Sequence, residues 1–268
     1  MPISKHLRSH RSIRSYRSDD IPDEWLNEFL QDGIRASSSG NMQSYSIIVT
    51  RNRDIKEKLY KAHFEQAMVR EAPMVITFCA DFHRMREWLR VSNAPDNFDN
   101  VMSFMVAAID AVLVAQNVAL AAEAQGLGIC FMGTTLASCR KIGKTLKLPK
   151  NVFPVTSIVL GHPNENPEVR DRLPQNGLVH YETYQDYSDE RIREIYRDRE
   201  TAGWDRYMAM PRLRKLVEDS GVENLAQLYT TVKYTRESHE RMSRALLDYL
   251  AEQDFMSGLE NYQAASSR

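Results

Sequence analysis

The sequence has few cysteines, no surplus of charge of either sign and no disulfide framework. Its 268 residues include only three cysteines, Cys79, Cys130 and Cys139, which lie in or beside apolar runs and form no CxxC pair. This usage is typical of a reducing, cytoplasmic setting. The 35 Lys and Arg residues nearly balance the 36 Asp and Glu residues, so no overall field attracts the protein to nucleic acid or to an anionic membrane. Any anion-binding site must therefore be local.

An uninterrupted apolar segment of membrane length is also missing. The basic amino terminus, MPISKHLRSHRSIRSYRS, has no apolar core and no small-residue cleavage site, so we do not expect a secretory signal. The most apolar segment, Val101 to Gln125, contains Asp110 and Glu123, which are too costly for an isolated membrane span. It predicts a buried helix that is apolar over more of its circumference than one small sheet can cover. The surplus apolar surface predicts a second copy of the chain as partner.

The histidines form no metal-binding pattern. None of the isolated ones stands at a typical ligand spacing from cysteine or carboxylate residues. We interpret them as structural or surface residues and predict no metal site; they are His63, His83, His162, His180 and His239.

Hydrophobic periodicity predicts helices and strands that alternate along the first two-thirds of the chain. The predicted strands are 45–50, 73–82, 128–134 and 153–160, and the predicted helices cover about 23–34, 54–71, 101–125 and 138–148. The segment 84–100 is polar and predicts an irregular connection. From about Tyr184 onward the charged sequence has helical periodicity without a strand pattern. We therefore predict an α+β core in residues 1–184 and a helical extension in residues 185–268.

The first candidate site is the arm His10-Arg11-Ser12-Ile13-Arg14. Arginine and serine side chains donate hydrogen bonds to phosphate oxygens, and Arg14 can point to the same face of an extended segment. The alternative is a solvated basic arm without a ligand.

The second candidate site is the loop Ser38-Ser39-Gly40-Asn41-Met42-Gln43. Its hydroxyl and amide groups, and a glycine that allows close approach to the backbone, suit a polar cofactor edge. An ordinary turn prefers the same residue types, so this interpretation stays open.

The third candidate site is Arg170-Asp171-Arg172, which follows the last predicted strand. Alternate residues of an extended chain share one side, so the two guanidinium groups can hold one phosphate. The alternative is a surface salt-bridge cluster formed with Asp171 and Glu168.

Taken in order, these three motifs, the strand-helix-strand middle and the segment Gly126 to Gly133 (GLGICFMG) resemble the FMN-dependent nitroreductase family. The likeness covers roughly Lys5 to Tyr184 and is closest to the larger bacterial oxygen-insensitive nitroreductases and flavin reductases that prefer NADPH. It implies a nitroreductase-like fold: a central, mostly antiparallel sheet flanked by helices, in an intertwined homodimer. The helical extension of residues 185–268 would wrap the partner subunit.

The resemblance also implies the positions of the FMN contacts. The arm would lie along the phosphate, the ribityl chain and the pyrimidine edge, Arg170 and Arg172 would close on the phosphate, and Gln66 would reach the polar edge of the ring. Some contacts of the second loop would come from the other subunit. The implied cofactor-binding residues are His10, Arg11, Ser12, Arg14, Ser38, Ser39, Gly40, Asn41, Gln43, Gln66, Phe131, Met132, Gly133, Thr134, Arg170 and Arg172.

Three positions depart from the family pattern. Thr134 stands where relatives usually have a second glycine, so its side chain narrows the expected pocket. Arg170 replaces the more common lysine, which retains the charge but changes the hydrogen-bond geometry. Gly40-Asn41 matches the general family more than the NADPH-preferring subgroup, so the choice between NADPH and NADH stays open.

The implied activity is hydride transfer from NADPH or NADH, through FMN, to nitroaromatics, quinones or similar small planar acceptors by a ping-pong mechanism. No acid, base or nucleophile of the protein is needed, because the chemistry lies in the cofactor. A flavin, azo or dehalogenating reductase of the same fold is the alternative within this class. The alternative from another class is a non-catalytic regulatory module that binds an anion and contacts a nucleic acid or protein partner.

Overall fold

The computed structural model describes residues 3–259 of the chain, and these divide into two compact units. The first contains the residues up to Glu168 and those from Met242 on, and the second is Val169–Arg241. Within the second unit, Gly177 packs against Ile195 of the following helix, and the division at 184/185 stays a prediction. Each unit is described by itself below. The wrapping of the extension around a partner stays a prediction.

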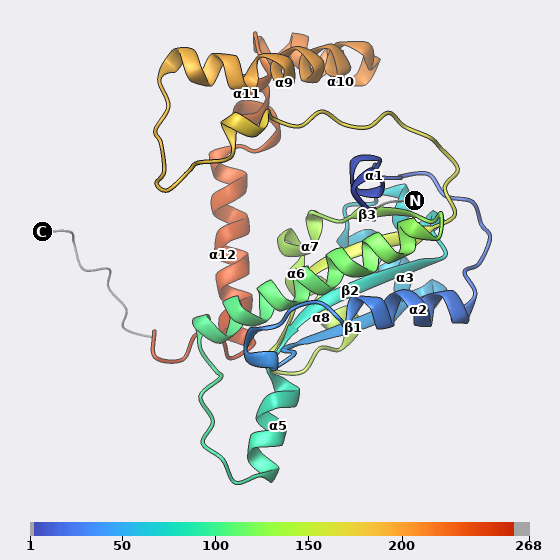
Figure 1. Cartoon of the computed structure of the whole chain (residues 1–268), viewed down its shortest axis with the longest axis vertical. Coiled ribbons are helices and arrows are strands. Elements are labelled where there is room, and N and C mark those ends of the chain that lie inside the picture. The colour runs from blue at the N-terminus through green and yellow to red at the C-terminus, as the bar shows by residue number, and fades with distance from the viewer. Residues whose placement is uncertain (1–2, 260–268) are drawn as a thin grey trace, which may run out of the picture. The chain divides into compact units, whose positions relative to one another are not determined.

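The first unit is built on a four-stranded antiparallel sheet, which confirms the predicted fold class (Figure 1). The strands lie in the order β1-β2-β4-β3, so β1 and β3 are its two edges. Every residue of β2 is buried, as its apolar run predicts. The strands are β1 (Tyr45–Thr50), β2 (Met74–Asp81), β3 (Gly128–Phe131) and β4 (Val152–Gly161).

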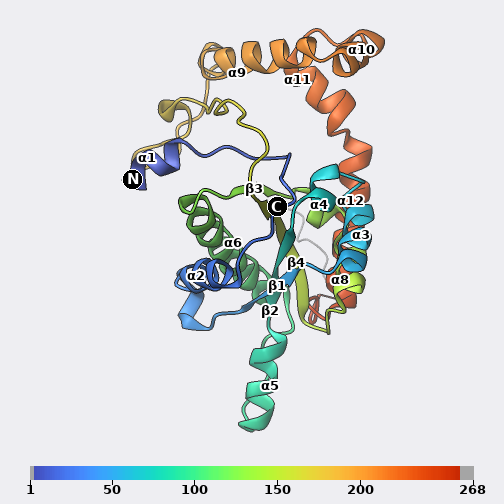
Figure 2. The ribbon, with the colours of Figure 1, turned by 90° about the vertical axis from the view of Figure 1, so that its right-hand side faces the viewer.

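Helices cover both faces of this sheet (Figure 2). One face carries α2 (Asp23–Gly33) and the long α6 (Val101–Ala124), which pack closely because Gly33 has no Cβ: a Cβ there would lie 2.2 Å from Val118 Cγ2. The other face carries α3 (Arg53–Ala62), α4 (Ala67–Glu71), α8 (Cys139–Leu146) and the end of α12 (Arg236–Glu252). The short helices α1 (Ile3–Arg8) and α7 (Thr134–Ala137) complete this unit together with α5 (His83–Val91).

Helix α6 is long and apolar enough to cross a membrane, yet it is a core helix. Its inward side chains, among them Ala107, Val114 and Val118, are fully buried in the main hydrophobic cluster. Asp110 is also fully buried, and its carboxylate is hydrogen-bonded within the protein. These contacts identify α6 as a core helix of the first unit.

Three predicted elements differ from the structure. Residues His83–Val91 form helix α5 rather than an irregular connection; Met85, Trp88 and Leu89 stand at helical spacing among charged residues, a short apolar period that the prediction missed. The predicted helix 54–71 is broken after Ala62, because Phe64 and Glu65 have left-handed φ angles of 56° and 57°. The predicted strand 128–134 ends at Phe131, where the chain turns into α7.

The second unit is helical and has a small core of its own. Its buried residues are Tyr207, Val217, Leu225 and Leu228. Gly203 allows α9 and Leu225 to approach, since a Cβ there would lie 2.3 Å from Leu225 Cδ2. The elements are α9 (Asp189–Ala209), α10 (Pro211–Ser220), α11 (Leu225–Leu228), a π-helical turn (Tyr229–Lys233) and the start of α12.

Candidate functional site

The arm that contains the first motif runs beside the edge strand β3. The N–H of Ile13 donates to the carbonyl of Ile129 at 2.9 Å, and Tyr16 pairs with Pro163 beyond the end of β4. Gly128 makes this approach possible, because a Cβ there would lie 2.7 Å from Ile13 Cγ1. The arm is therefore held as an extended segment with its alternate side chains on opposite sides.

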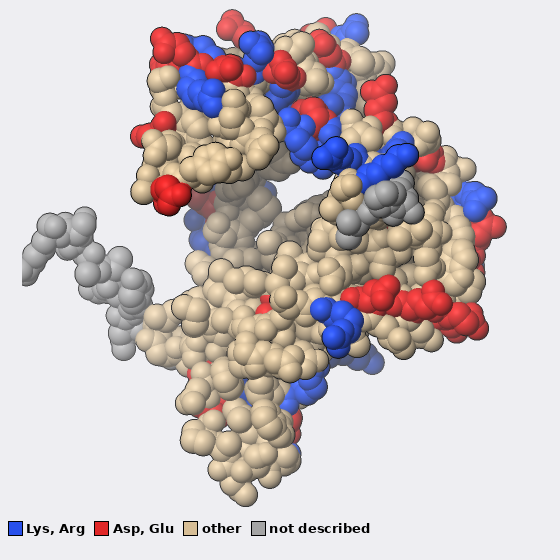
Figure 3. Space-filling view, in the orientation of Figure 1, with Lys and Arg blue, Asp and Glu red and all other residues tan. Residues whose placement is uncertain are grey.

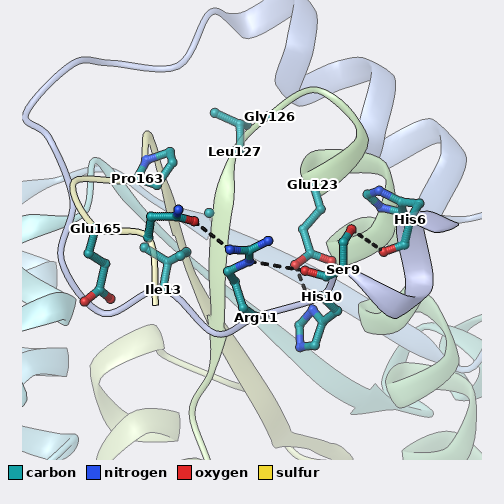
Figure 4. A pocket seen from close by; sticks show the side chains of 12 residues that line it. His6, Ser9, His10, Arg11, Ile13, Glu123, Gly126, Leu127, Pro163 and Glu165 are labelled. Carbon is teal, nitrogen blue, oxygen red and sulfur yellow. Dashed lines mark hydrogen bonds and ion pairs between the residues drawn. The ribbon is translucent and has the colours of Figure 1, made fainter. Parts of the chain in front are cut away.

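The side chains of the arm form one wall of a pocket of about 290 Å³ (Figure 4). His10 Nδ1 lies 2.7 Å from the carboxylate of Glu123, near the end of α6. The Arg11 guanidinium donates to the side-chain oxygen of Asn166 at 2.6 Å and to the carbonyl of Pro167 at 3.3 Å. The pocket thus combines a fixed arginine, a histidine and main-chain groups in a hollow open to solvent.

The backbone of the arm also presents donors to an acidic group. The carboxylate of Glu165 accepts the N–H groups of both Arg14 and Ser15, the latter at 3.2 Å. Two successive main-chain N–H groups aimed at one carboxylate form the kind of concavity that binds anionic oxygen atoms. A free anion that used these donors would have to displace Glu165.

Ser12 and Arg14 lie close to the buried thiol of Cys130 in β3. Burial raises the pKa of this thiol, while the charge of Arg14 and a hydrogen bond with Ser12 oppose the rise. Cys130 is therefore an unreactive thiol at neutral pH.

The second motif forms a tight loop whose backbone is held in an unfavourable conformation. Gly40, Asn41 and Gln43 have φ angles of 56°, 54° and 51°, and two of these residues are not glycine. Such conformations persist only where surrounding contacts hold them, and they gather at functional sites. The turn Ser39–Asn41 is a short 3₁₀ helix.

Asp110 of α6 supplies the contacts that hold this loop. Its carboxylate accepts the N–H of Ser39 at 3.0 Å, the hydroxyl of Ser44 at 2.9 Å and the N–H of Ser44 at 3.4 Å. In the sequence this residue is notable only as an acidic interruption of an apolar run. A single acidic residue within an apolar run is nevertheless a signal, because a buried carboxylate needs hydrogen-bond partners.

A third group of polar residues meets at the carboxyl end of β3. His63 Nδ1 lies 2.8 Å from Thr134 Oγ1. The amide nitrogen of Gln66 donates to the carbonyl of His63 at 3.0 Å and to Thr134 Oγ1 at 3.4 Å. The left-handed residues Phe64 and Glu65 turn the chain back so that Gln66 returns to His63. His63, which the sequence presents only as an isolated histidine, is thus joined to two of the implied flavin residues.

The segment beside this group has open space on one side. Phe131 ends the strand, Met132 is buried and donates its N–H to the carbonyl of Ser157 at 2.8 Å, and Gly133 is exposed. A Cβ added to Gly133 would meet nothing within 4 Å. The backbone at Gly133 is therefore accessible to a flat ligand.

Within one chain, the loop 38–43 lies far from the arm and from the polar group formed by His63, Gln66 and Thr134. It leads into β1 at Tyr45, whereas the arm and Thr134 adjoin β3 at the opposite edge. Through the paired residues Phe131, Ile158 and Ile76, the end of β3 is level with Val49, four residues beyond Tyr45. The strand spacing places the two regions about 14 Å apart across the sheet and about 13 Å apart along it.

The third motif lies in the second unit. Asp171 forms ion pairs with Arg199 at 3.3 Å and with Arg206 at 3.5 Å, both in α9. Partial burial raises its pKa, but the two arginine charges outweigh this and lower the pKa overall. The Arg172 guanidinium donates to the carbonyls of Arg170 and Asp171 at 3.2 Å and 3.0 Å. The meeting of Arg170 and Arg172 with the arm stays a prediction.

No group of three metal-ligating side chains occurs among residues 3–259. The charged and polar groups of the three regions instead suit an organic anion with a flat, polar ring. The arm offers donors for a phosphate, and the ends of β3 and α3 offer hydrogen-bonding groups around an open glycine.

Comparison with known proteins adds independent information. The model of the Nitroreductase family matches residues 7–162. The curated FMN reductase (NAD(P)H) of Bacillus subtilis is 30% identical over an alignment of 241 positions, and the match covers 82% of this chain and 97% of that protein. Two solved structures have the same fold. The NfrA1 nitroreductase of B. subtilis has a TM-score of 0.82 at 27% identity and covers 94% of this chain and 98% of its own. The NADPH:FMN oxidoreductase of Vibrio harveyi, complexed with NAD⁺, has a TM-score of 0.74 at 27% identity and covers 95% and 99%.

Proposed function

Because the chain belongs to the nitroreductase family, we propose that it is an FMN-dependent oxidoreductase that uses NADPH or NADH to reduce small planar acceptors. When bound, FMN supplies the chemistry: it takes a hydride from the reduced nicotinamide and passes it to the acceptor. Nitroaromatics, quinones and free flavin are the expected acceptor classes. Free flavin is favoured by the names of the relatives, an FMN reductase and an NADPH-flavin oxidoreductase.

The observation that carries this proposal is the arrangement around β3. The arm with Arg11, Ser12 and Arg14 is hydrogen-bonded to one end of the strand, and Gln66 and Thr134 meet at the other. β3 has four residues, which at about 3.4 Å each span about 14 Å, the scale of a flavin with its side chain. Donors for a phosphate and groups for a polar ring edge therefore lie at a suitable separation.

Two further features fit a bound flavin. Gly133 leaves open space where a side chain would obstruct a ring. His63 Nε2 is buried without a hydrogen-bond partner, which marks this region as polar but incompletely satisfied within the described chain. His10, Phe131 and Met132 complete the lining that the family pattern implies.

The role of the protein is to bind, orient and stabilise. Arg11, with Arg170 and Arg172, would neutralise the phosphate, and Ser12 would donate to it or to the ribityl chain. Arg14 would place positive charge beside the pyrimidine edge, where reduction adds negative charge. Specificity for the acceptor would come from the shape of the open face, not from a catalytic side chain.

We place the second loop in the site of the partner subunit. Ser38, Ser39, Gly40, Asn41 and Gln43 are separated from β3 by the width of the sheet, so one chain does not bring them to the same ring edge. The loop is fixed to Asp110 of α6, whose neighbour Ile109 is exposed on the outer face of that helix. A partner packed on α6 would therefore receive the loop.

The outer face of α6 supports a homodimer. It exposes large apolar side chains at helical spacing, and few charged groups lie over it (Figure 3). An apolar patch of this kind marks an interface. Its members are Met102, Met105, Ile109, Val112 and Leu113. The three buried, unpaired cysteines agree with a cytoplasmic location.

Initial-velocity kinetics of the FMN-loaded protein test this function. With NADPH and a quinone or nitroaromatic varied together, parallel double-reciprocal lines are expected, because each substrate uses the same face in turn. Intersecting lines would contradict the shared site. A colourless protein that does not take up FMN would favour the anion-binding module instead.

A further inference from the structure

The polar group at the end of β3 determines which way the Gln66 amide points. Gln66 Nε2 faces the carbonyl oxygen of His63 at 3.0 Å. A carbonyl oxygen only accepts hydrogen bonds, so the amide nitrogen, not the amide oxygen, must occupy this position. The same nitrogen is 3.4 Å from Thr134 Oγ1. Both hydrogens of the amide are thereby directed at the protein.

The amide oxygen of Gln66 is consequently the atom left for a ligand. Gln66 Oε1 makes no hydrogen bond within residues 3–259, and the side chain is only partly buried. An amide held in this way presents an acceptor. A freely rotating amide would present a donor or an acceptor with equal ease.

His63 fixes the hydroxyl that completes this arrangement. Its ring is fully buried, and its Nδ1 lies 2.8 Å from Thr134 Oγ1. Burial lowers the pKa of His63 to about 4, so the ring is neutral at physiological pH. A neutral ring has one N–H. If that hydrogen is on Nδ1, Thr134 Oγ1 accepts from both His63 and Gln66, and Nε2 is left as an unpaired acceptor rather than an unpaired donor.

We propose that Thr134 and His63 are positioning residues that lock the Gln66 amide with its oxygen toward the flavin, where it accepts the N–H of the pyrimidine ring. This inference rests on the proposed function. The pyrimidine ring of a flavin has two carbonyl oxygens and one N–H, so an amide locked as an acceptor can pair only with the N–H. A residue without a hydroxyl at position 134 would leave the amide without its second anchor.

The test compares FMN with 3-methyl-FMN, in which a methyl group replaces the hydrogen of that N–H. Dissociation constants of both ligands are measured by titrating the apoprotein and following the flavin spectrum. The Gln66→Leu variant cannot accept a hydrogen bond. Its ratio of the two dissociation constants therefore measures the effect of the methyl group's size alone. Wild-type protein should discriminate against 3-methyl-FMN by a further factor of about three to ten, the value of one net hydrogen bond.

Two variants of Thr134 test the lock. Thr134→Val removes the hydroxyl but retains the shape, and its discrimination should fall toward that of Gln66→Leu. Thr134→Ser retains the hydroxyl, and its discrimination should stay near the wild-type value. Partial unfolding weakens the binding of FMN and of 3-methyl-FMN by the same factor, so the ratio of their dissociation constants does not change. A purely structural role of Thr134 would therefore leave this ratio at its wild-type value.

The outcomes separate this inference from the proposed function. If Thr134→Val discriminates as wild type does, Thr134 does not position Gln66. If Gln66→Leu and wild type have the same ratio, Gln66 does not accept the pyrimidine N–H, although FMN binding stands. If wild-type apoprotein binds neither flavin, the proposed function itself fails.

Discussion

The buried carboxylate of Asp110 and the backbone N–H of Ser39 form a 3.0 Å hydrogen bond that joins the core helix α6 to the loop preceding β1. The partners are 71 residues apart in the sequence. The bond holds a loop with three left-handed residues in a single conformation. The order of this loop therefore depends on a residue outside it.

Asp110→Asn should loosen this loop. The amide would turn one acceptor into a donor facing the N–H or hydroxyl of Ser44, so at least one charge-assisted hydrogen bond is lost, at a cost of about 1.5 to 3 kcal/mol. We expect the free energy of unfolding to fall by this amount and FMN to bind about tenfold more weakly. Denaturant titration and flavin titration measure the two effects. The exposed Asp32→Asn in α2 is the matched control; equal values for the two variants would contradict the role of Asp110.

Arg11→Gln should weaken the binding of FMN but not of riboflavin, which lacks the phosphate. Arg11 is fixed by Asn166 and Pro167 at the edge of the pocket, and a charge-assisted bond to phosphate contributes about 1.5 to 3 kcal/mol. The preference for FMN over riboflavin should thus fall by roughly tenfold or more. Arg51→Gln is a control, since Arg51 pairs with Asp23 away from the arm. An unchanged preference in Arg11→Gln would remove Arg11 from the phosphate site.

His63 should make the protein sensitive to acid. Burial lowers its pKa from 6.5 to about 4, so between these values the unfolded chain binds a proton that the folded chain does not. Above pH 6.5 the neutral His63 ring carries no penalty in the folded state. As the pH drops from 6.5 toward 4, the free energy of unfolding therefore falls by about 3 kcal/mol in all.

Unfolding curves across this pH range check the effect. His63→Asn should flatten the acid slope, because it removes the titrating ring. His239→Asn, at an exposed histidine, should leave the slope as it is. An acid slope unchanged in His63→Asn would assign the effect to other groups.

Ile109→Glu should dissociate the proposed homodimer. Ile109 lies at the centre of the apolar face of α6 and is 53% exposed in the single chain, so a carboxylate there would be buried unpaired at the interface. Light scattering after size-exclusion chromatography should show the mass of a single chain and a loss of bound FMN. The control Lys58→Glu, at an exposed position of α3, should leave the proposed dimer intact. A stable dimer of Ile109→Glu would place the interface elsewhere.

Mixed dimers test whether each site combines two subunits. Arg11→Gln damages the arm, and Gly40→Val damages the loop because a β-branched residue is strained at the φ of 56° found there. Each homodimer should be poor in FMN. A dimer with one subunit of each kind has one site with both lesions and one intact site, so its FMN content should recover toward half. No recovery would mean that both elements serve the same subunit's site.

The sequence predicts the sheet well because its strands are short apolar runs with clear ends. The bounds of β1 match the prediction at both Tyr45 and Thr50, and the runs of β2 and β4 are correct to within one residue. The failures are also physical. Helix α5 is short and has no fully buried residue, and the break at Phe64 and Glu65 places ordinary residues in a left-handed conformation that no residue type predicts.

The site is predictable only in part, for a similar reason. The motifs at Arg11, Ser39 and Thr134 can be found from their order, whereas their supports are tertiary contacts between distant segments. Asp110 and His63 belong to no sequence motif. Their roles depend on contacts with Ser39 and Thr134, which only the tertiary fold brings next to them. The distance of the second loop from β3 likewise follows from strand order and register.

The most direct test of the central claim is an anaerobic titration of the purified, FMN-loaded protein. Addition of NADPH or NADH should bleach the flavin absorption band with one equivalent of nucleotide for each bound FMN. A later addition of a quinone, a nitroaromatic or free FMN should restore the band, and the rates would rank the acceptors. Flavin that stays oxidised with both nucleotides, or a protein that binds no flavin, would contradict the account.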